Sequence, residues 1–124
     1  MKKDKRNYKM FLKDIQLSME RIADYIIDYD YVKFRQDFKT SDAVIRNFEI
    51  IGEASKQIPD EIKEKYSHIP WLEMYYLRNK ISHEYFGIDY ALLWDIATNY
   101  LPNNKKQIDE VLKNENLGEQ TLFK

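Results

Sequence analysis

Apolar residues recur along most of the chain at alternating steps of three and four, the spacing of one face of an α-helix. The first such stripe is long and predicts an amphipathic helix from about Tyr8 to Tyr29. Its inward positions are Leu12, Ile15, Met19, Ile22 and Ile26. Charged residues occupy the opposite face, as expected where a helix meets solvent.

Residues 30–39 predict a short helical turn that packs three aromatic side chains against the core, namely Tyr31, Phe34 and Phe38. A second long helix is expected over residues 42–57. Thr40 or Ser41 offers a side-chain oxygen as its N-cap. Gly52 lies inside this helix at a cost of about 1 kcal/mol relative to Ala, so it predicts a close crossing with another helix.

Prolines punctuate the second half of the chain. Pro59 suits the start of a short helix over residues 60–65. Pro70 begins a further predicted helix, and Gly87 would end it by adopting a left-handed conformation.

Asp89 is expected to cap the next helix. The inward positions expected in that helix are Leu93, Ile96, Ala97, Tyr100 and Leu101. Pro102 should kink it, because proline cannot donate to the helical ladder. The period resumes as far as Leu112, and residues 113–124 predict a frayed tail.

No strand alternation, internal repeat or glycine-rich phosphate loop interrupts this pattern. We therefore expect a single all-α domain over residues 1–124, with its core over residues 8–112. The expected architecture is an antiparallel bundle of about four to five helices.

Composition is typical of a folded domain, with 44% hydrophobic and 33% charged residues in 124. Cysteine is absent, which excludes disulfides and thiolate metal sites and fits a cytoplasmic location. The sequence also predicts neither a secretory signal nor a membrane span. The net charge of −1 gives no sign of a general nucleic-acid coat. Any RNA binding must then be local, or shared with a second subunit.

Candidate chemistry concentrates in residues 77–87, where Arg78 is followed by His83 and Tyr85. A guanidinium can hold a phosphate, and an imidazole can exchange a proton near neutral pH. These two groups suffice to cleave RNA without a metal. On a straight helix Arg78 and His83 would lie about 140° apart. Either the helix distorts near His83, or a second subunit completes the site across a two-fold axis.

Other polar residues are weaker candidates. His68 precedes a proline and is interpreted as a connector residue. Glu49 and Glu53 lie one helical turn apart and could bind a metal as a pair, although a solvated or ion-paired role is the simpler interpretation. With two histidines and no cysteine, a tetrahedral zinc site is not expected. Most of the ten tyrosines lie at core spacing.

Three blocks of sequence resemble the HepT-like toxin family, whose members are minimal proteins of the HEPN superfamily. The first block is residues 42–54 (Asp-Ala-Val-Ile-Arg-Asn-Phe-Glu-Ile-Ile-Gly-Glu-Ala), and the second is Ile69-Pro70-Trp71. The third is Arg78-Asn79 together with residues 83–89 (His-Glu-Tyr-Phe-Gly-Ile-Asp). The resemblance covers roughly residues 10–112.

The resemblance implies a homodimer that cuts RNA in a cleft lined by the paired motifs, with no metal or other cofactor. Arg78 and His83 correspond to the catalytic pair, and Asn79 to a supporting polar residue. Tyr85 corresponds to the tyrosine to which a minimal nucleotidyltransferase antitoxin attaches AMP. The one departure is residues 80–82 (Lys-Ile-Ser), where more apolar residues are expected.

The leading hypothesis is an endoribonuclease toxin of a toxin–antitoxin pair that leaves a 2′,3′-cyclic phosphate and a 5′-hydroxyl. The alternative is a non-catalytic HEPN domain that binds nucleotides or acts as a scaffold for a nucleotidyltransferase. The near-neutral charge favours this alternative, and the intact set Arg78, Asn79 and His83 argues against it. A plain dimerisation module would leave that set unexplained.

Overall fold

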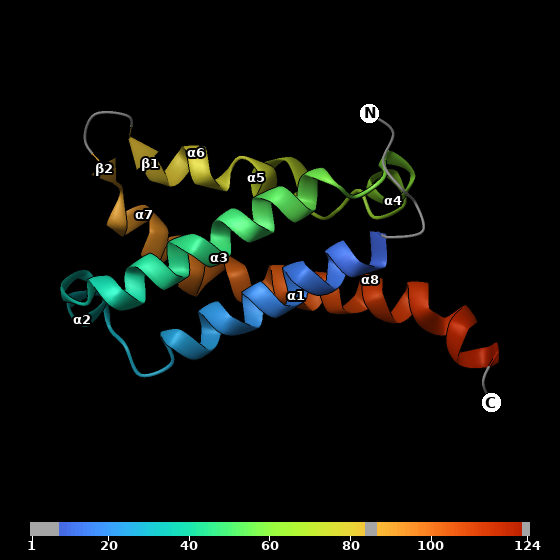
Figure 1. Cartoon of the computed structure of the whole chain (residues 1–124), viewed down its shortest axis with the longest axis horizontal. Helices are drawn as coiled ribbons and strands as arrows, with labels where there is room; N and C mark the ends of the chain where they lie inside the picture. Colours follow the sequence, from blue (N-terminus) through green and yellow to red (C-terminus); the bar gives the residue numbers. More distant parts are fainter. Residues whose placement is uncertain (1–7, 84–86, 123–124) are drawn as a thin grey trace.

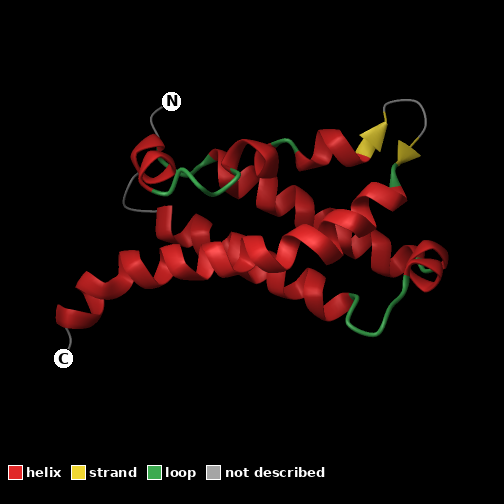
Figure 2. Ribbon diagram, turned by 180° about the vertical axis from the view of Figure 1, so that it is seen from behind, coloured by secondary structure: helices red, strands yellow, loops and turns green. Residues whose placement is uncertain are grey.

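The computed structural model describes residues 8–83 and 87–122, and for residues 78, 82, 83 and 116–122 it describes the backbone only. Three long helices form the body of the molecule (Figures 1 and 2). They are α1 (Tyr8–Tyr25), α3 (Phe38–Lys56) and α8 (Leu101–Leu122). Helix α1 packs along both α3 and α8, so it lies at the centre of the bundle. The predicted all-helical class is confirmed for these elements.

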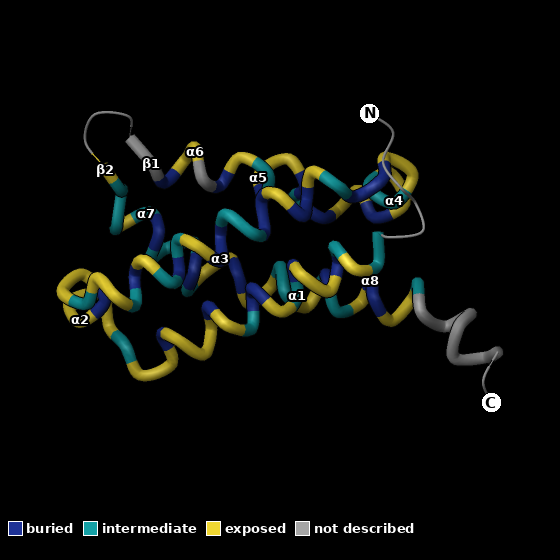
Figure 3. Tube along the Cα trace, viewed as in Figure 1, coloured by how far each residue is buried: buried dark blue, intermediate teal, exposed yellow. Residues whose placement is uncertain are grey.

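Fully buried aliphatic and aromatic side chains from all three helices meet in one continuous core (Figure 3). The five residues predicted to line the inner face of the first helix are all buried, although α1 ends at Tyr25, one residue before the last of them, Ile26. Within the part of the chain that the structure describes, no helix is long and apolar enough to cross a membrane.

Two aspartates set the helix boundaries around residue 37. Asp30 caps α2 (Tyr31–Gln36) by accepting from the Lys33 amide, and Asp37 caps α3 by accepting from the Thr40 amide. The sequence predicted this cap at Thr40 or Ser41, which was wrong, because Asp37 offers a carboxylate one turn earlier. Of the three aromatic residues expected in the core here, only Phe34 is fully buried, whereas Phe38 is 56% exposed and Tyr31 is 37% exposed.

A chain of short helices runs antiparallel to α3 and carries the candidate motif. It comprises α4 (Asp60–Lys65), α5 (Trp71–Tyr75) and α6 (Leu77–Ile81). The sequence predicted α4 correctly, but it predicted one helix from Pro70 to Gly87 where the structure has two helices and a hairpin. The helix ends at Ile81, and β1 (Ser82–His83) then pairs antiparallel with β2 (Gly87–Ile88).

Gly52 lies where α3 crosses α5, as the sequence predicted. A Cβ atom at this position would stand 3.2 Å from the carbonyl oxygen of Tyr75 and 3.4 Å from that of Met74. These are backbone atoms, which cannot swing aside as a side chain can, so glycine permits the close approach of the two helices.

Asp89 caps α7 (Tyr90–Asp95) by accepting from the Leu92 amide at 3.0 Å, which confirms the predicted cap. A π-helical turn, η2 (Ile96–Tyr100), then links α7 to α8. The distortion predicted at Pro102 therefore occurs one turn earlier. There the wider π turn changes the backbone hydrogen-bond pattern, to which proline cannot donate. The π turn also shifts the register, so Tyr100 is 59% exposed although the sequence predicted it in the core.

Glu115 ties three parts of the chain together. Its carboxylate accepts from the hydroxyls of Tyr8 at 2.7 Å and Tyr66 at 2.6 Å, and it forms an ion pair with Lys65 at 3.0 Å. Burial raises the pKa of this carboxyl group, but the hydrogen bonds from Tyr66, Tyr8 and Lys65 outweigh burial and lower the pKa to about 2. Helix α8 extends to Leu122 in the structure, and the frayed tail from residue 113 stays a prediction.

The lowered pKa makes Glu115 a source of pH-dependent stability. Its contribution is present above the pKa of about 4.5 that the group has when unfolded, and is lost as the pH falls towards 2. We expect Glu115→Gln to lower the free energy of unfolding at pH 7 by about 2–3 kcal/mol. At pH 2.5 the difference should fall below about 1 kcal/mol. Urea denaturation at both pH values measures this, with the exposed Glu110→Gln as control. An equal loss at both pH values would contradict it.

Candidate functional site

The candidate motif lies where a helix gives way to an extended hairpin. Arg78 and Asn79 belong to α6, whereas His83 belongs to β1 and pairs with Gly87 of β2. Because α6 ends at Ile81, the separation of about 140° expected on a straight helix does not apply. The distortion near His83 is therefore one of the two solutions that the sequence left open.

Local interactions fix both arms of this hairpin. Leu77 and Ile81 are buried and anchor α6 in the core. The Asp89 amide donates to the Ile81 carbonyl at 2.7 Å, which joins the end of α6 to the start of α7. Gly87 has a φ of +80°, a conformation that side-chain-bearing residues rarely adopt. The sequence predicted this left-handed glycine but assigned it to a helix end instead of a hairpin.

The predicted site residues can be placed to different extents. The backbone of Arg78 and His83 lies on the consecutive elements α6 and β1, and the Asn79 side chain is exposed. Tyr85 lies outside the described residues.

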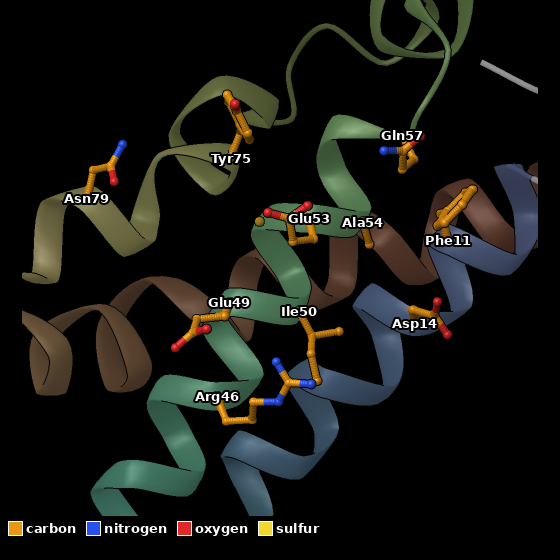
Figure 4. Close-up of a pocket in the computed structure, with 11 residues that line it drawn as sticks. Phe11, Asp14, Arg46, Glu49, Ile50, Glu53, Ala54, Gln57, Tyr75 and Asn79 are labelled. Carbon is orange, nitrogen blue, oxygen red and sulfur yellow. The ribbon is translucent and has the colours of Figure 1, made fainter. Parts of the chain in front are cut away.

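Asn79 lies on a groove of about 600 Å³ between α6, α3 and α1 (Figure 4). Tyr75 lines the same groove one helical turn before Asn79. The opposite wall carries charged side chains from α1 and α3, namely Asp14, Arg46, Glu49 and Glu53. Three carboxylates against one guanidinium leave this groove acidic. We call it the acidic groove.

The groove places two of the weaker candidates beside the motif. Glu49 and Glu53 both line it, and neither has an ion pair with another described residue. Among the residues described, no third ligand, whether a histidine or a carboxylate, lies close enough to these two glutamates to form a metal-binding group. His68 lies apart, exposed in the turn between α4 and α5, as its interpretation as a connector requires.

Several residues near the motif were missed from the sequence. Asp14 lies in no motif, and Arg46 lies in the first of the three resembling blocks but was assigned no role there. Packing of α1 beside α3 brings both residues to the groove. Asn47 of α3 is buried, and its Oδ1 has no hydrogen-bond partner in the described part of the molecule, although its amide donates to the Ala43 carbonyl. A polar residue on the apolar face of α3 was the available signal.

A second hollow lies on the other side of α6, between α6, α7, η2 and α8. Its volume is about 450 Å³, and Lys80 of the motif segment lies on its edge. Lys80 is the first of the three residues, 80–82, at which the sequence departs from the family pattern. Helix α6 therefore separates two hollows, with Asn79 facing one and Lys80 facing the other.

The chain is similar to a family of ribonucleases. The family described as ribonuclease HepT-like matches residues 15–111. A protein of Methanocaldococcus jannaschii provisionally named an RNase is 44% identical over 109 residues, which are 88% of this chain and 90% of the relative. The probable ribonuclease HepT of Thermococcus cleftensis is 40% identical over 88% of this chain and 99% of its own length. No solved structure gives a significant match.

Proposed function

Because this chain belongs to the ribonuclease HepT-like family, we propose that it is a metal-independent endoribonuclease and the toxin of a toxin–antitoxin pair. Family membership and similarity along nearly the whole chain support the enzyme class. The observation that carries the mechanism is the break between α6 and β1. This break relieves the angular separation that a straight helix would impose on Arg78 and His83.

The proposed reaction uses the RNA's own 2′-hydroxyl as the nucleophile. His83 removes its proton, and the 2′-oxygen attacks the adjacent phosphorus while the bond from phosphorus to the 5′-oxygen breaks. The departing 5′-oxygen takes up a proton, which leaves a 2′,3′-cyclic phosphate and a 5′-hydroxyl. Arg78 stabilises the negative charge that builds on the phosphate oxygens. Asn79 supports this pair by orienting it or by contacting the phosphate.

We expect cleavage of a short unstructured RNA to stay within about twofold when EDTA is present, because proton transfer and charge stabilisation both come from side chains. The assay follows the appearance of the cyclic phosphate by mass spectrometry. The matched substrate carries a single 2′-deoxynucleotide at the cleavage site and should not be cut. Loss of activity in EDTA that magnesium restores would point instead to a two-carboxylate mechanism involving Glu49 and Glu53.

We further propose that the active form is a homodimer in which the motif segments of two subunits face each other. Because α6 ends at Ile81, a second subunit is no longer required to overcome the angular separation of Arg78 and His83. Charge still supports it, because a subunit with a net charge of −1 holds a polyanion poorly by itself. Pairing would bring two copies of Arg78 and Lys80 together.

Sedimentation at micromolar concentration is expected to give a mass near twice 15.1 kDa. The same sample should cut RNA. A strictly monomeric protein that still cuts RNA would contradict the dimer, while leaving the ribonuclease assignment intact.

The proposed partner is a minimal nucleotidyltransferase that silences the toxin by attaching AMP to Tyr85. A free ribonuclease and an ATP-dependent partner would both act where cellular RNA and ATP are present, which implies the cytoplasm.

The competing proposal is a non-catalytic nucleotide-binding or scaffold domain. The carboxylates of the acidic groove beside Asn79 favour the scaffold role, because they repel the phosphates of RNA and of nucleotides alike. Absence of cleavage by the dimer under all conditions would favour this competing proposal.

A further inference from the structure

The hollow beside Lys80 differs in chemistry from the acidic groove. Its lining includes apolar side chains from six elements, among them the buried Met19, Met74, Leu77 and Leu101. At about 450 Å³ it lies within the size range of small-molecule sites, which are typically apolar with a few polar groups. We call it the apolar hollow.

Polar groups are confined to the edge of the apolar hollow. Glu73 and Lys80 lie on the α5–α6 side, and neither has an ion pair among the described residues. Asp95 lies on the α7 side and accepts from the Asn99 amide at 2.6 Å. The edge therefore offers two carboxylate acceptors and one ammonium group around an apolar floor.

The π-helical turn supplies an aromatic wall. Because η2 shifts the register before α8, Tyr100 leaves the core and lies on the hollow with 59% of its surface exposed. π-Helical turns recur at functional sites. An exposed tyrosine ring beside an apolar floor is a surface on which a nucleobase can stack.

We propose that the apolar hollow binds one nucleobase of the RNA strand next to the cleaved phosphate, and that it prefers a base that carries an amino group. This inference rests on the proposed function. Lys80 follows Arg78 and Asn79 directly in α6 and lines the hollow, so a strand that crosses α6 at these residues reaches the hollow on the side of α6 opposite the acidic groove. The base stacks on Tyr100, and its amino group donates to Glu73 or Asp95. Uracil presents a carbonyl in place of that amino group and is disfavoured.

The acidic groove is a poorer site for the same base. Asp14, Glu49 and Glu53 line it with one arginine, so the strand's phosphates would meet repulsion there. The apolar hollow is lined by two carboxylates and one ammonium group, so it carries one negative charge fewer than the acidic groove and has the ammonium group of Lys80 beside the motif. The strand's phosphates are therefore repelled less at the hollow than at the groove.

The test uses RNA oligonucleotides that differ at one nucleotide beside the mapped cleavage site. This nucleotide is adenosine, guanosine, cytidine, uridine or an abasic unit. For the wild type we expect the abasic unit to lower kcat/KM about tenfold. Tyr100→Ala should lower kcat/KM about tenfold on RNA with the preferred base, and should lower it no further on the abasic RNA. Glu73→Gln should reduce the preference over uridine. Tyr25→Ala and Glu64→Gln, which are exposed residues away from the hollow, serve as matched controls.

Binding of the same oligonucleotides with a 2′-deoxynucleotide at the cleavage site separates this inference from the proposed function. Base-dependent binding without cleavage of the normal RNA would overturn the ribonuclease and leave the hollow as a base site. If the cleavage rate does not depend on the neighbouring base, and Tyr100→Ala cleaves as fast as wild type, the base-binding role of the hollow is wrong and the ribonuclease assignment stands. A change of oligomeric state in Tyr100→Ala, with base discrimination unchanged, would identify a protein interface and also overturn it.

Discussion

His83→Ala is expected to lower RNA cleavage by a factor of 10² to 10⁴, about the usual contribution of a general acid–base group. Arg78→Ala should lower it by about 10² to 10³, because the charge on the phosphate in the transition state would lose its stabilising cation. Initial rates on one defined oligonucleotide measure both. These losses are the largest expected from any single substitution in the chain.

The same variants should remain folded. The backbone pairing of His83 with Gly87 does not depend on the side chain, and α6 is anchored by the buried Leu77 and Ile81. Melting temperatures are therefore expected within a few degrees of wild type. His68→Ala and Arg21→Ala remove the other histidine and an exposed arginine of α1 as matched controls. A His83→Ala enzyme that keeps more than a tenth of the activity would exclude His83 as the base.

Modification of Tyr85 is expected to abolish cleavage in proportion to the fraction modified. In this step the phenol oxygen attacks the α-phosphorus of ATP, pyrophosphate leaves, and the phenol proton is lost. The attached AMP adds a negative charge and a bulky group two residues from His83. The charge would compete with RNA for Arg78 and repel its backbone, as other charge-adding modifications do.

The measurement combines the protein with its partner nucleotidyltransferase and ATP, followed by peptide mass mapping and an RNA-cleavage assay. A mass shift in multiples of AMP is expected on Tyr85 and should be absent in Tyr85→Phe. Tyr76→Phe, an exposed tyrosine on the same segment, should still be modified and silenced. Full cleavage by protein modified at Tyr85 would refute the off-switch.

The sequence predicted the positions of α1 and α3 to within about four residues, because burial of one helix face makes apolar residues recur with the helical period. The buried face of α1 and the close crossing at Gly52 both follow from residue spacing and size. Helix ends were less predictable, since Asp37, Thr40 and Ser41 are all good caps and the choice depends on tertiary packing. Local composition did not distinguish the paired strands β1 and β2 from a continued helix, because each strand is only two residues long.

The candidate site followed the same division. Arg78, Asn79 and His83 were identified from their spacing and the family resemblance, because a motif is local in sequence. The acidic groove and the apolar hollow were not foreseen, because residues from helices distant in sequence form them. Tyr100 shows the cause most clearly, since one π turn moved it from an expected core position to the surface.

The contacts of Glu115 also bear on the order in which the chain folds. Helices α1 and α3 are close in sequence, so their pairing costs little loop entropy and can form early. The bond between Tyr8 and Glu115 spans 107 positions and requires α8 to be docked. We infer that α8 joins last and that a folding transition state contains α1 and α3 but not this bond. Acid would then act mainly by accelerating unfolding and leave the folding rate nearly unchanged.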